Sequence, residues 1–283
     1  MPVEQNDKTI VLTHPSGASV EIYLFGATVT SWKTAGRERI FLSNKAHLDG
    51  SAAIRGGIPV VFPVFGPPPS SPPEYAALAQ HGFARTQTWK LEKILLDRSE
   101  GVSVRLVAPP PPATFPHSFE LHYVVTLAAH ELVCNLHVLN TGTEDFKFQA
   151  LLHTYLAVPD VSKIALTGID AGTSYKDKVL GGAVGAAPGG PLVIDQQVDR
   201  VYAKVPSKEI GLDDGAGDHY KVRFRGFEDC TIWNPADVTG SKIADMEDGG
   251  WNRYVCIEPG FVSEFKSIKP GEQFIGQQTI SIA

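Results

Sequence analysis

Residues 121–139, LHYVVTLAAHELVCNLHVL, contain two apolar runs joined by a short connection, and this stretch indicates how the chain folds. The runs 121–127 and 132–139 are rich in β-branched and aromatic residues and have the length of strands. The connection at 128–131 is short enough to join them as an antiparallel hairpin. We therefore expect antiparallel strand pairing to organise the neighbouring segments.

Similar strand patterns lie on both sides of this hairpin. They cover residues 20–24, 28–32, 39–43, 101–107, 146–158, 164–169, 220–224, 230–233, 253–257 and 273–282. Helical periodicity is nearly absent, and residues 75–80 are the best candidate for a short helical turn. Parallel βαβ units would need a helix between successive strands, so the pattern predicts an all-β antiparallel sandwich or barrel.

The length allows one large β domain or two ordinary domains. The 283 residues include 27 glycines and 21 prolines, which punctuate many short elements and disfavour a helix bundle. We expect loops at 67–73, 109–116 and 181–190, none of which is long or polar enough to mark a domain boundary. Antiparallel sheets reach this length as one unit, so we expect a single domain over residues 1–283.

Charge and composition exclude several classes of partner. The 25 Lys and Arg residues against 31 Asp and Glu give a net charge of −6, so no general cationic field exists for nucleic acid or an anionic membrane. The most apolar stretch, 58–65, is far shorter than the roughly 20 residues of a membrane helix. The N-terminal sequence MPVEQNDKTI lacks a secretory signal, and the three separated cysteines suggest reduced thiols. We expect a soluble, cytoplasmic protein.

Two arginines beside glycines are candidate anion ligands. Arg55 precedes Gly56 and Gly57, and Arg85 follows Gly82 by three residues. Glycine lets the backbone approach a ligand closely, and a guanidinium group can hold a carboxylate or phosphate with two parallel hydrogen bonds. Each segment alone is more often an ordinary turn with a solvated arginine.

His153 and Glu258, each of which lies in an expected strand, are candidates for proton transfer. An unperturbed histidine titrates near neutrality. Glu258 shares a strand face with Tyr254 and Cys256, and Pro259 is expected to end that strand. A carboxylate at the end of an otherwise apolar strand is expected to have a raised pKa and could act as a general base. Each residue alone is more often structural.

A metal site is not expected. Nine histidines are present, but the closest pair, His117 and His122, would lie on opposite faces of an extended strand. No HxH or HExxH motif occurs.

Eight motifs in order make the chain resemble the glucose-6-phosphate 1-epimerase (hexose-6-phosphate mutarotase) branch of the aldose 1-epimerase superfamily. The resemblance covers nearly the whole chain, from Gly26 to the expected C-terminal strand. It implies a large antiparallel β-sandwich of the galactose mutarotase-like supersandwich type. The motifs are RGGIP at 55–59, FPVFG at 62–66, HGFAR at 81–85 with Trp89, LHTY at 152–155, VDRVY at 198–202, IWNP at 232–235, ADM at 244–246 and CIEPG at 256–260.

The resemblance also implies an activity, the interconversion of α and β anomers of hexose 6-phosphates without a cofactor or metal. Opening a pyranose ring needs a base at the anomeric hydroxyl and an acid at the ring oxygen. The resemblance implies that His153 and Glu258 form the catalytic pair, and we hypothesise that Glu258 is the base and protonated His153 the acid. The expected partner is a small-molecule substrate, and the protein is expected to be a monomer.

The resemblance assigns four further residues to the substrate. Arg55 and Arg85 are implied to hold the sugar phosphate, and Gln80 and Asp199 to contact the substrate. Asp195 is close enough in the sequence to be an alternative to Asp199.

Two other functions are compatible with the same motifs. A free-aldose 1-epimerase would use the two arginines only structurally, so their substitution would affect hexose and hexose 6-phosphate equally. A non-catalytic sugar-phosphate sensor or carbohydrate-binding module could also use this fold.

Overall fold

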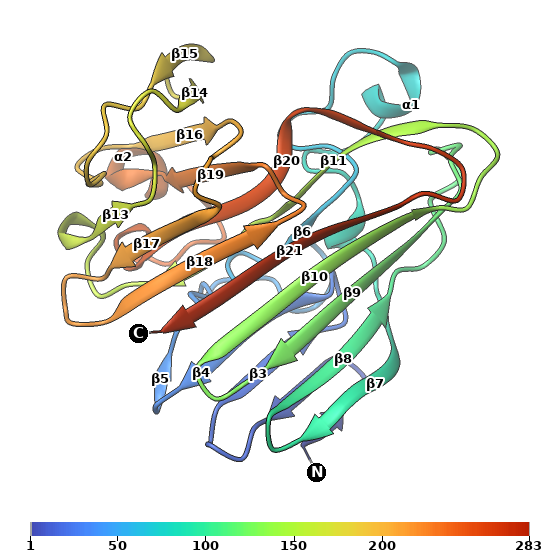
Figure 1. The fold of residues 1–283 in the computed structure, drawn as a ribbon, viewed down its shortest axis with the longest axis horizontal. Coiled ribbons are helices and arrows are strands. Elements are labelled where there is room, and N and C mark those ends of the chain that lie inside the picture. Colours follow the sequence, from blue (N-terminus) through green and yellow to red (C-terminus); the bar gives the residue numbers. More distant parts are fainter. Residues whose placement is uncertain (1, 283) are drawn as a thin grey trace.

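The computed structural model describes residues 2–282, in which three antiparallel sheets dominate and the helices are short (Figure 1). The N-terminal sheet has five strands in chain order. They are β1 (Val3–Gln5), β2 (Thr9–Thr13), β3 (Ser19–Tyr23), β4 (Thr28–Thr34) and β5 (Arg37–Glu38). The expected all-β antiparallel class is confirmed.

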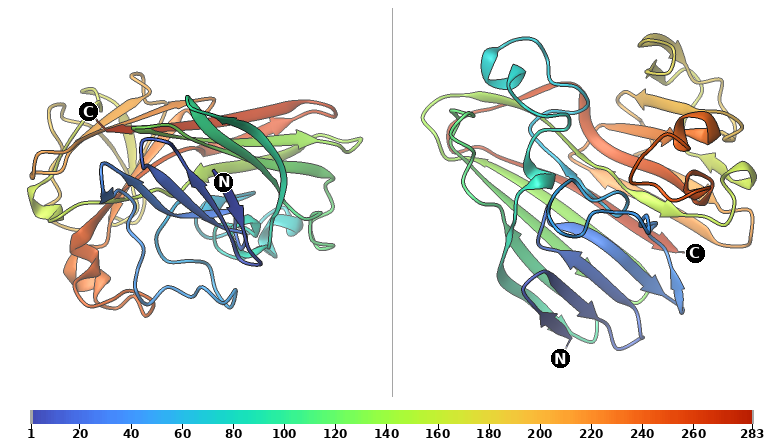
Figure 2. Two further views of the ribbon diagram at one scale, coloured as in Figure 1. Left: turned by 90° about the horizontal axis from the view of Figure 1, so that it is seen from below. Right: turned by 180° about the vertical axis from the view of Figure 1, so that it is seen from behind.

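The second sheet has eight strands and includes the hairpin formed by residues 121–139. Its strands, in spatial order, are β13 (Ala165–Thr167), β17 (Glu209–Asp213), β18 (His219–Arg225), β21 (Gln273–Ile282), β10 (Glu131–Asn140), β9 (Phe119–Leu127), β8 (Gly101–Val107) and β7 (Lys90–Arg98). Alternate residues of β10 are buried, as expected for a sheet with one face on the core. The N-terminal sheet lies over one face of this layer (Figure 2).

The third sheet carries Asp199 and Glu258 of the candidate site. Its strands, in spatial order, are β15 (Ala183–Ala186), β14 (Ser174–Asp177), β16 (Val198–Tyr202), β19 (Asp229–Asn234), β20 (Tyr254–Ile268), β11 (Phe146–Leu152) and β6 (Val60–Val61), and β12 (Tyr155–Ala157) also pairs with β20. One contiguous apolar core joins all three sheets and includes residues from Ile10 to Ile280.

Short helices connect the sheets. They are the α-helices α1 (Pro73–Ala76) and α2 (Ala236–Gly240) and the 3₁₀ helices η1 (Ala84–Thr86), η2 (Val161–Lys163) and η3 (Gly250–Arg253). The helical turn expected at 75–80 begins earlier, because proline at the first helical position favours a start at Pro73. None of the helices described within residues 2–282 is long and apolar enough to cross a membrane.

Two of the predicted elements are wrong, namely the strand at 39–43 and the uninterrupted loop at 181–190. Residues 39–43 form no continuous strand, because Ile40 bridges Leu156 whereas Leu42 bridges Gly56, so the segment passes between two partners. The loop expected at 181–190 contains β15, which pairs with β14 through backbone hydrogen bonds that small residues permit.

Two further corrections concern the strands that carry His153 and Glu258. The single strand expected at 146–158 breaks into β11 and β12, with His153 and Thr154 between them. Pro259 does not end its strand, because β20 continues to Ile268. The ladder between β11 and β20 ends at Gly260, next to Pro259, so a residue without an N–H group is tolerated there.

Candidate active site

His153 is held where the chain crosses from β11 to β12. Its N–H group donates to the Pro59 carbonyl at 3.0 Å, and its ring stacks on Tyr155 with 4.8 Å between ring centres. The adjacent Thr154 hydroxyl donates to Gln278 Oε1 at 2.8 Å, which ties this crossing to the second sheet. The strand break therefore fixes the direction of the imidazole.

Glu258 lies on β20 beside His153 and is almost completely buried. Its Oε1 atom is 3.3 Å from His153 Nδ1, and its side chain is 1% exposed. The register places Thr231 of β19 opposite Glu258. Glu258 Oε2, His153 Nδ1 and Thr231 Oγ1 are buried without a hydrogen-bond partner among the described residues. Buried polar atoms of this kind are expected to gain partners when a ligand binds.

Burial moves the two pKa values in opposite directions. It raises the pKa of Glu258 well above its usual range, as the sequence predicts, and the charge of Asp199 adds to this rise. Burial lowers the pKa of His153 well below its usual range, and the charges of His81, Arg85, Arg55 and Lys178 lower it further. Burial therefore disfavours the charged forms of both groups in the free site, which opposes the proton distribution in our sequence-based hypothesis.

Arg55 is oriented by two partners and by the glycines that follow it. Its Nε donates to Asp245 Oδ1 at 3.0 Å, and its Nη1 donates to the Tyr155 hydroxyl at 3.3 Å. Gly57 has a φ of +75°, and a Cβ atom there would lie 2.4 Å from the Val29 carbonyl oxygen. Only glycine fits this turn, which delivers Arg55 to the cavity.

Arg85 lies in η1 and has no carboxylate within ion-pair distance among residues 2–282. Its Nη2 donates to the Gln80 carbonyl at 3.0 Å, and its Nε is buried without a partner. Burial lowers the pKa of Arg85, and the charge of Arg55 contributes in the same direction. The site therefore holds a positive charge that no side chain neutralises.

Asp199 lies on β16 and faces the cavity, whereas Asp195 is exposed and does not line it. Asp199 Oδ2 is 3.3 Å from Lys178 Nζ. Burial raises the pKa of Asp199, and the charge of Lys178 opposes that rise. Of the two aspartates that the sequence left open, only Asp199 is placed to contact a ligand in the cavity.

All six residues assigned by the resemblance line one cavity of about 180 Å³. The structure therefore brings together every residue that the sequence proposed for the site. The lining residues are Arg55, Phe65, Gln80, His81, Arg85, His153, Lys178, Asp199, Thr231, Trp233 and Glu258.

His81 and Lys178 are cavity residues whose importance the sequence analysis missed. His81 Nδ1 accepts the Gly66 N–H at 3.1 Å, and burial lowers the pKa of His81 to about 3. His81 lies in the HGFAR motif, so this motif could have indicated that His81 lines the site. Lys178 follows β14, a strand that the sequence did not indicate, and no motif included it.

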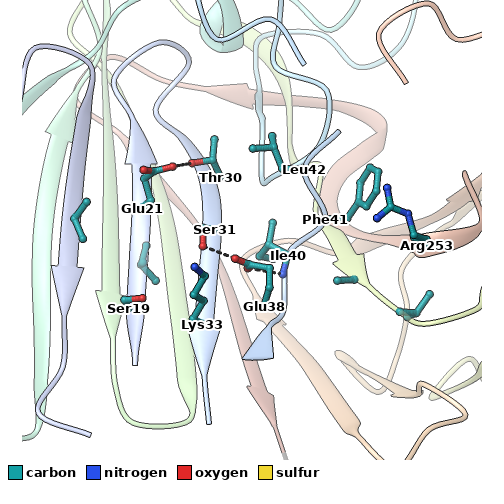
Figure 3. A pocket seen from close by; sticks show the side chains of 14 residues that line it. Ser19, Glu21, Thr30, Ser31, Lys33, Glu38, Ile40, Phe41, Leu42 and Arg253 are labelled. Atoms are coloured by element: carbon teal, nitrogen blue, oxygen red, sulfur yellow. Dashed lines mark hydrogen bonds between the residues drawn. The ribbon is translucent and has the colours of Figure 1, made fainter. Parts of the chain in front are cut away.

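A larger groove of about 630 Å³ lies beside the N-terminal sheet and contains none of the predicted site residues (Figure 3). Its carboxylates are already engaged, because Glu21 accepts from Thr30 and Glu38 accepts from Ser31. The smaller cavity has the unpartnered acid and base groups, so it is the candidate active site.

One cluster of metal-ligating side chains is found within residues 2–282, and two of its members, His153 and Glu258, line this cavity. Donor atoms of His153, Cys256 and Glu258 lie within 4.8 Å of one another. Nitrogen, sulfur and oxygen ligands could hold zinc in a tetrahedral site. However, positively charged Arg55 and Arg85 line the same small cavity and oppose a further cation. The expectation that no metal is required stays a prediction.

Known proteins are similar to this chain over most of its length. A family model described as aldose 1-epimerase matches residues 8–281. A provisionally assigned glucose-6-phosphate 1-epimerase of Cenchrus ciliaris is 32% identical over 96% of this chain and 84% of its own length. A protein of Escherichia coli K12 with the same provisional name is 30% identical over 97% of this chain and 90% of its own length.

Solved structures show the same fold. A provisionally assigned mutarotase of Salmonella typhimurium superposes with a TM-score of 0.87 at 26% identity, covering 99% of this chain and 92% of that chain. A galactose 1-epimerase of Lactobacillus acidophilus has a TM-score of 0.75 at 15% identity, covering 100% of this chain and 97% of that one. The supersandwich architecture implied by the motifs is confirmed.

Proposed function

The chain belongs to the aldose 1-epimerase family, and on that premise we propose that it interconverts the α and β anomers of hexose 6-phosphates, chiefly glucose 6-phosphate. Family membership makes it an isomerase that acts on a small sugar. The relatives from Cenchrus ciliaris and Escherichia coli are named as glucose-6-phosphate 1-epimerases, which supports a phosphorylated substrate for this chain. We further propose that it is a cytoplasmic monomer.

The uncompensated charge of Arg85 is the observation that carries the proposal. Arg85 has free donors in the same cavity as His153 and Glu258 and no carboxylate within ion-pair distance among residues 2–282. A phosphate dianion would neutralise this charge and accept two parallel hydrogen bonds from one guanidinium group. Arg55, which is fixed by Asp245, would supply a second set of donors. A free hexose would leave the charge of Arg85 unpaired.

The reaction needs one group that accepts a proton and one that donates a proton, and the cavity contains two such groups. One group takes the proton from the anomeric hydroxyl while the C1–O5 bond breaks and its electron pair moves to O5. The other group gives a proton to O5, and the open-chain aldehyde forms. Rotation about the C1–C2 bond presents the other carbonyl face, and the reverse transfers close the ring. We assign the two transfers to Glu258 and His153.

Substrate binding can set the protonation of the pair. Burial disfavours charge on both groups, so in the free site it favours a proton on Glu258 over one on His153. Transfer across the 3.3 Å contact from Oε1 to Nδ1 would produce a carboxylate base and an imidazolium acid. A bound phosphate dianion offsets the cations that lower the pKa of His153 and so favours this transfer. Binding of the phosphate would thus prepare the acid and the base together.

The test is the rate at which fresh α-glucose 6-phosphate approaches anomeric equilibrium, followed by NMR with the spontaneous rate subtracted. Glu258→Gln should reduce kcat by at least about 1,000-fold, since amide replaces carboxyl at the reacting proton. Glu264→Gln is the matched control, because Glu264 is an exposed residue of the same strand that pairs with Lys204. This control should retain wild-type turnover.

Three outcomes would contradict the proposal in different ways. Wild-type turnover by Glu258→Gln would remove Glu258 from the mechanism. Equal acceleration of glucose and glucose 6-phosphate would favour the free-aldose enzyme. Binding of glucose 6-phosphate without acceleration of either sugar would favour the non-catalytic sensor.

A further inference from the structure

The hairpin of β14 and β15 lies at the edge of the third sheet (Figure 1). Lys178, which directly follows β14, lines the active-site cavity. The register places Asp177 opposite Arg200, so Lys178 comes beside Asp199. The Lys178 N–H donates to the Asp199 carbonyl at 2.8 Å, and Asp177 Oδ1 accepts the Val179 N–H at 3.0 Å. The backbone at Lys178 is therefore fixed from both sides.

The Lys178 side chain is also held, although lysine side chains usually extend into water. Its Nζ lies 3.3 Å from Asp199 Oδ2 and 4.6 Å from the centre of the Phe65 ring. The first contact is an ion pair and the second has cation–π geometry. Both partners line the catalytic cavity, and the side chain is 32% exposed. The ammonium group thus has a defined position in the cavity wall.

The charges around Lys178 differ from those around Arg85. Among residues 2–282, Lys178 is the one cation within ion-pair distance of Asp199. Asp199 and Glu258 share a small cavity, so their negative charges repel each other. Burial raises the pKa of both carboxyl groups, and the charge of Lys178 lowers both. Arg85, in contrast, has no carboxylate to balance.

We propose that Lys178 is a positioning residue for the anomer interconversion, which fixes the Asp199 carboxylate against the sugar and balances the negative charge that forms on Glu258. Lys178 does this without binding the substrate phosphate. The proposal rests on the proposed function, because it assigns a role within that reaction. A substrate hydroxyl can then donate to one carboxylate oxygen of Asp199, while the Lys178 ammonium group holds the other oxygen.

The test compares Lys178→Met and Lys178→Arg with the control Lys176→Met. Lys176 lies two residues earlier on β14 and is exposed, outside the active-site lining. Lys178→Met should lower kcat by about 10- to 100-fold for glucose 6-phosphate, with KM changed by less than about threefold. The acidic limb of its kcat–pH profile should move to higher pH by about one unit. Lys178→Arg should restore the profile, and Lys176→Met should match wild type.

Two kinetic results would overturn the proposal. A selective rise in KM for glucose 6-phosphate with an unmoved pH profile would make Lys178 a phosphate ligand. Unchanged kinetics in Lys178→Met would make it a surface residue.

Failure of the proposed function can be distinguished from failure of the Lys178 proposal. If the wild-type protein accelerates neither sugar, the proposed function fails, and Lys178 is then tested without turnover. Carbon-13 NMR titration of the Asp199 and Glu258 carboxyl groups should show both titrating at higher pH in Lys178→Met. Unchanged titration of both groups would overturn the electrostatic role.

Discussion

Arg85 should separate recognition of the phosphate from the chemistry of the ring. Arg85→Met is expected to lower kcat/KM for glucose 6-phosphate by about 100-fold, or about 2.7 kcal/mol, because charge-assisted donors are lost. The slower reaction of free glucose should change little, since glucose has no anion for Arg85 to bind. The measurement is anomeric exchange of both sugars by NMR.

The matched control for Arg85 is Arg225→Met, because Arg225 is exposed on the second sheet and remote from the cavity. Equal losses for both sugars in Arg85→Met would assign Arg85 to the ring chemistry or to the shape of the cavity.

His81 should make the folded protein sensitive to acid. Its pKa of about 3 in the folded state lies below the ordinary 6.5, so between these values the unfolded chain binds the extra proton. The free energy of unfolding should therefore fall as the pH drops from 6.5 towards 3, by up to about 1.4 kcal/mol per pH unit for this residue. His81→Asn should flatten that slope, as measured by urea unfolding at pH 7, 6 and 5.

Asparagine suits position 81 because His81 has a φ of +66°, a left-handed conformation that asparagine tolerates. His47→Asn is the control, since His47 is exposed and should leave the slope unchanged. An unaltered slope in His81→Asn would mean that other groups cause the acid sensitivity.

At the scale of single residues, the sequence predicted the site from motifs and missed what no motif contained. His153, Glu258, Arg55 and Arg85 lie in motifs, and the fold brings them into one cavity. Lys178 could not be predicted, because its place depends on the pairing of two short strands that show no alternation. The lowered pKa of His153 was equally hidden, since it depends on burial that only the packed structure defines.

At the scale of elements, the turn at Gly82 should be far less tolerant of a side chain than an open turn. Gly82 has a φ of +70°, and a Cβ atom there would lie 2.2 Å from the Phe62 carbonyl oxygen. Gly82→Ala should therefore cost at least about 3 kcal/mol of unfolding free energy, since backbone strain and a backbone clash add. Denaturant unfolding measures this loss.

Gly36 provides a matched comparison, with a φ of +73° and open space around its Cβ direction. Gly36→Ala should cost only the backbone strain of about 1 kcal/mol. Similar losses in the two variants would show that the close approach to Phe62 relaxes without cost.

The elements that the sequence predicted well are those whose pattern is local. The hairpin of β9 and β10 and strand β8 have clear runs of β-branched residues. The break between β11 and β12 was not predictable, because it arises from bonds to distant partners, Pro59 and Gln278. The continuation of β20 past Pro259 likewise depends on where a neighbouring ladder ends.

At the scale of the whole molecule, we predict one cooperative unfolding transition, because a single apolar core joins the three sheets. In the variant Trp233→Phe with Trp251→Phe, the fluorescence reports only Trp32 and Trp89, which are buried in that core. Its denaturation midpoint should coincide with the midpoint from far-ultraviolet circular dichroism. Separate midpoints would divide the chain into two domains and contradict the expectation of one.

Strand β21 follows all the other strands described within residues 2–282, yet it lies inside the second sheet between β10 and β18. A ribosome therefore makes the other described strands before the one that joins the two halves of this sheet. Until β21 emerges, β10 and β18 both present open edges, which invite pairing with other nascent chains. Gln278, which holds the Thr154 hydroxyl next to His153, arrives with the same strand. Completion of the sheet and alignment of the proposed catalytic histidine are thus one event, and a chain that stops short of β21 would be both inactive and prone to aggregate.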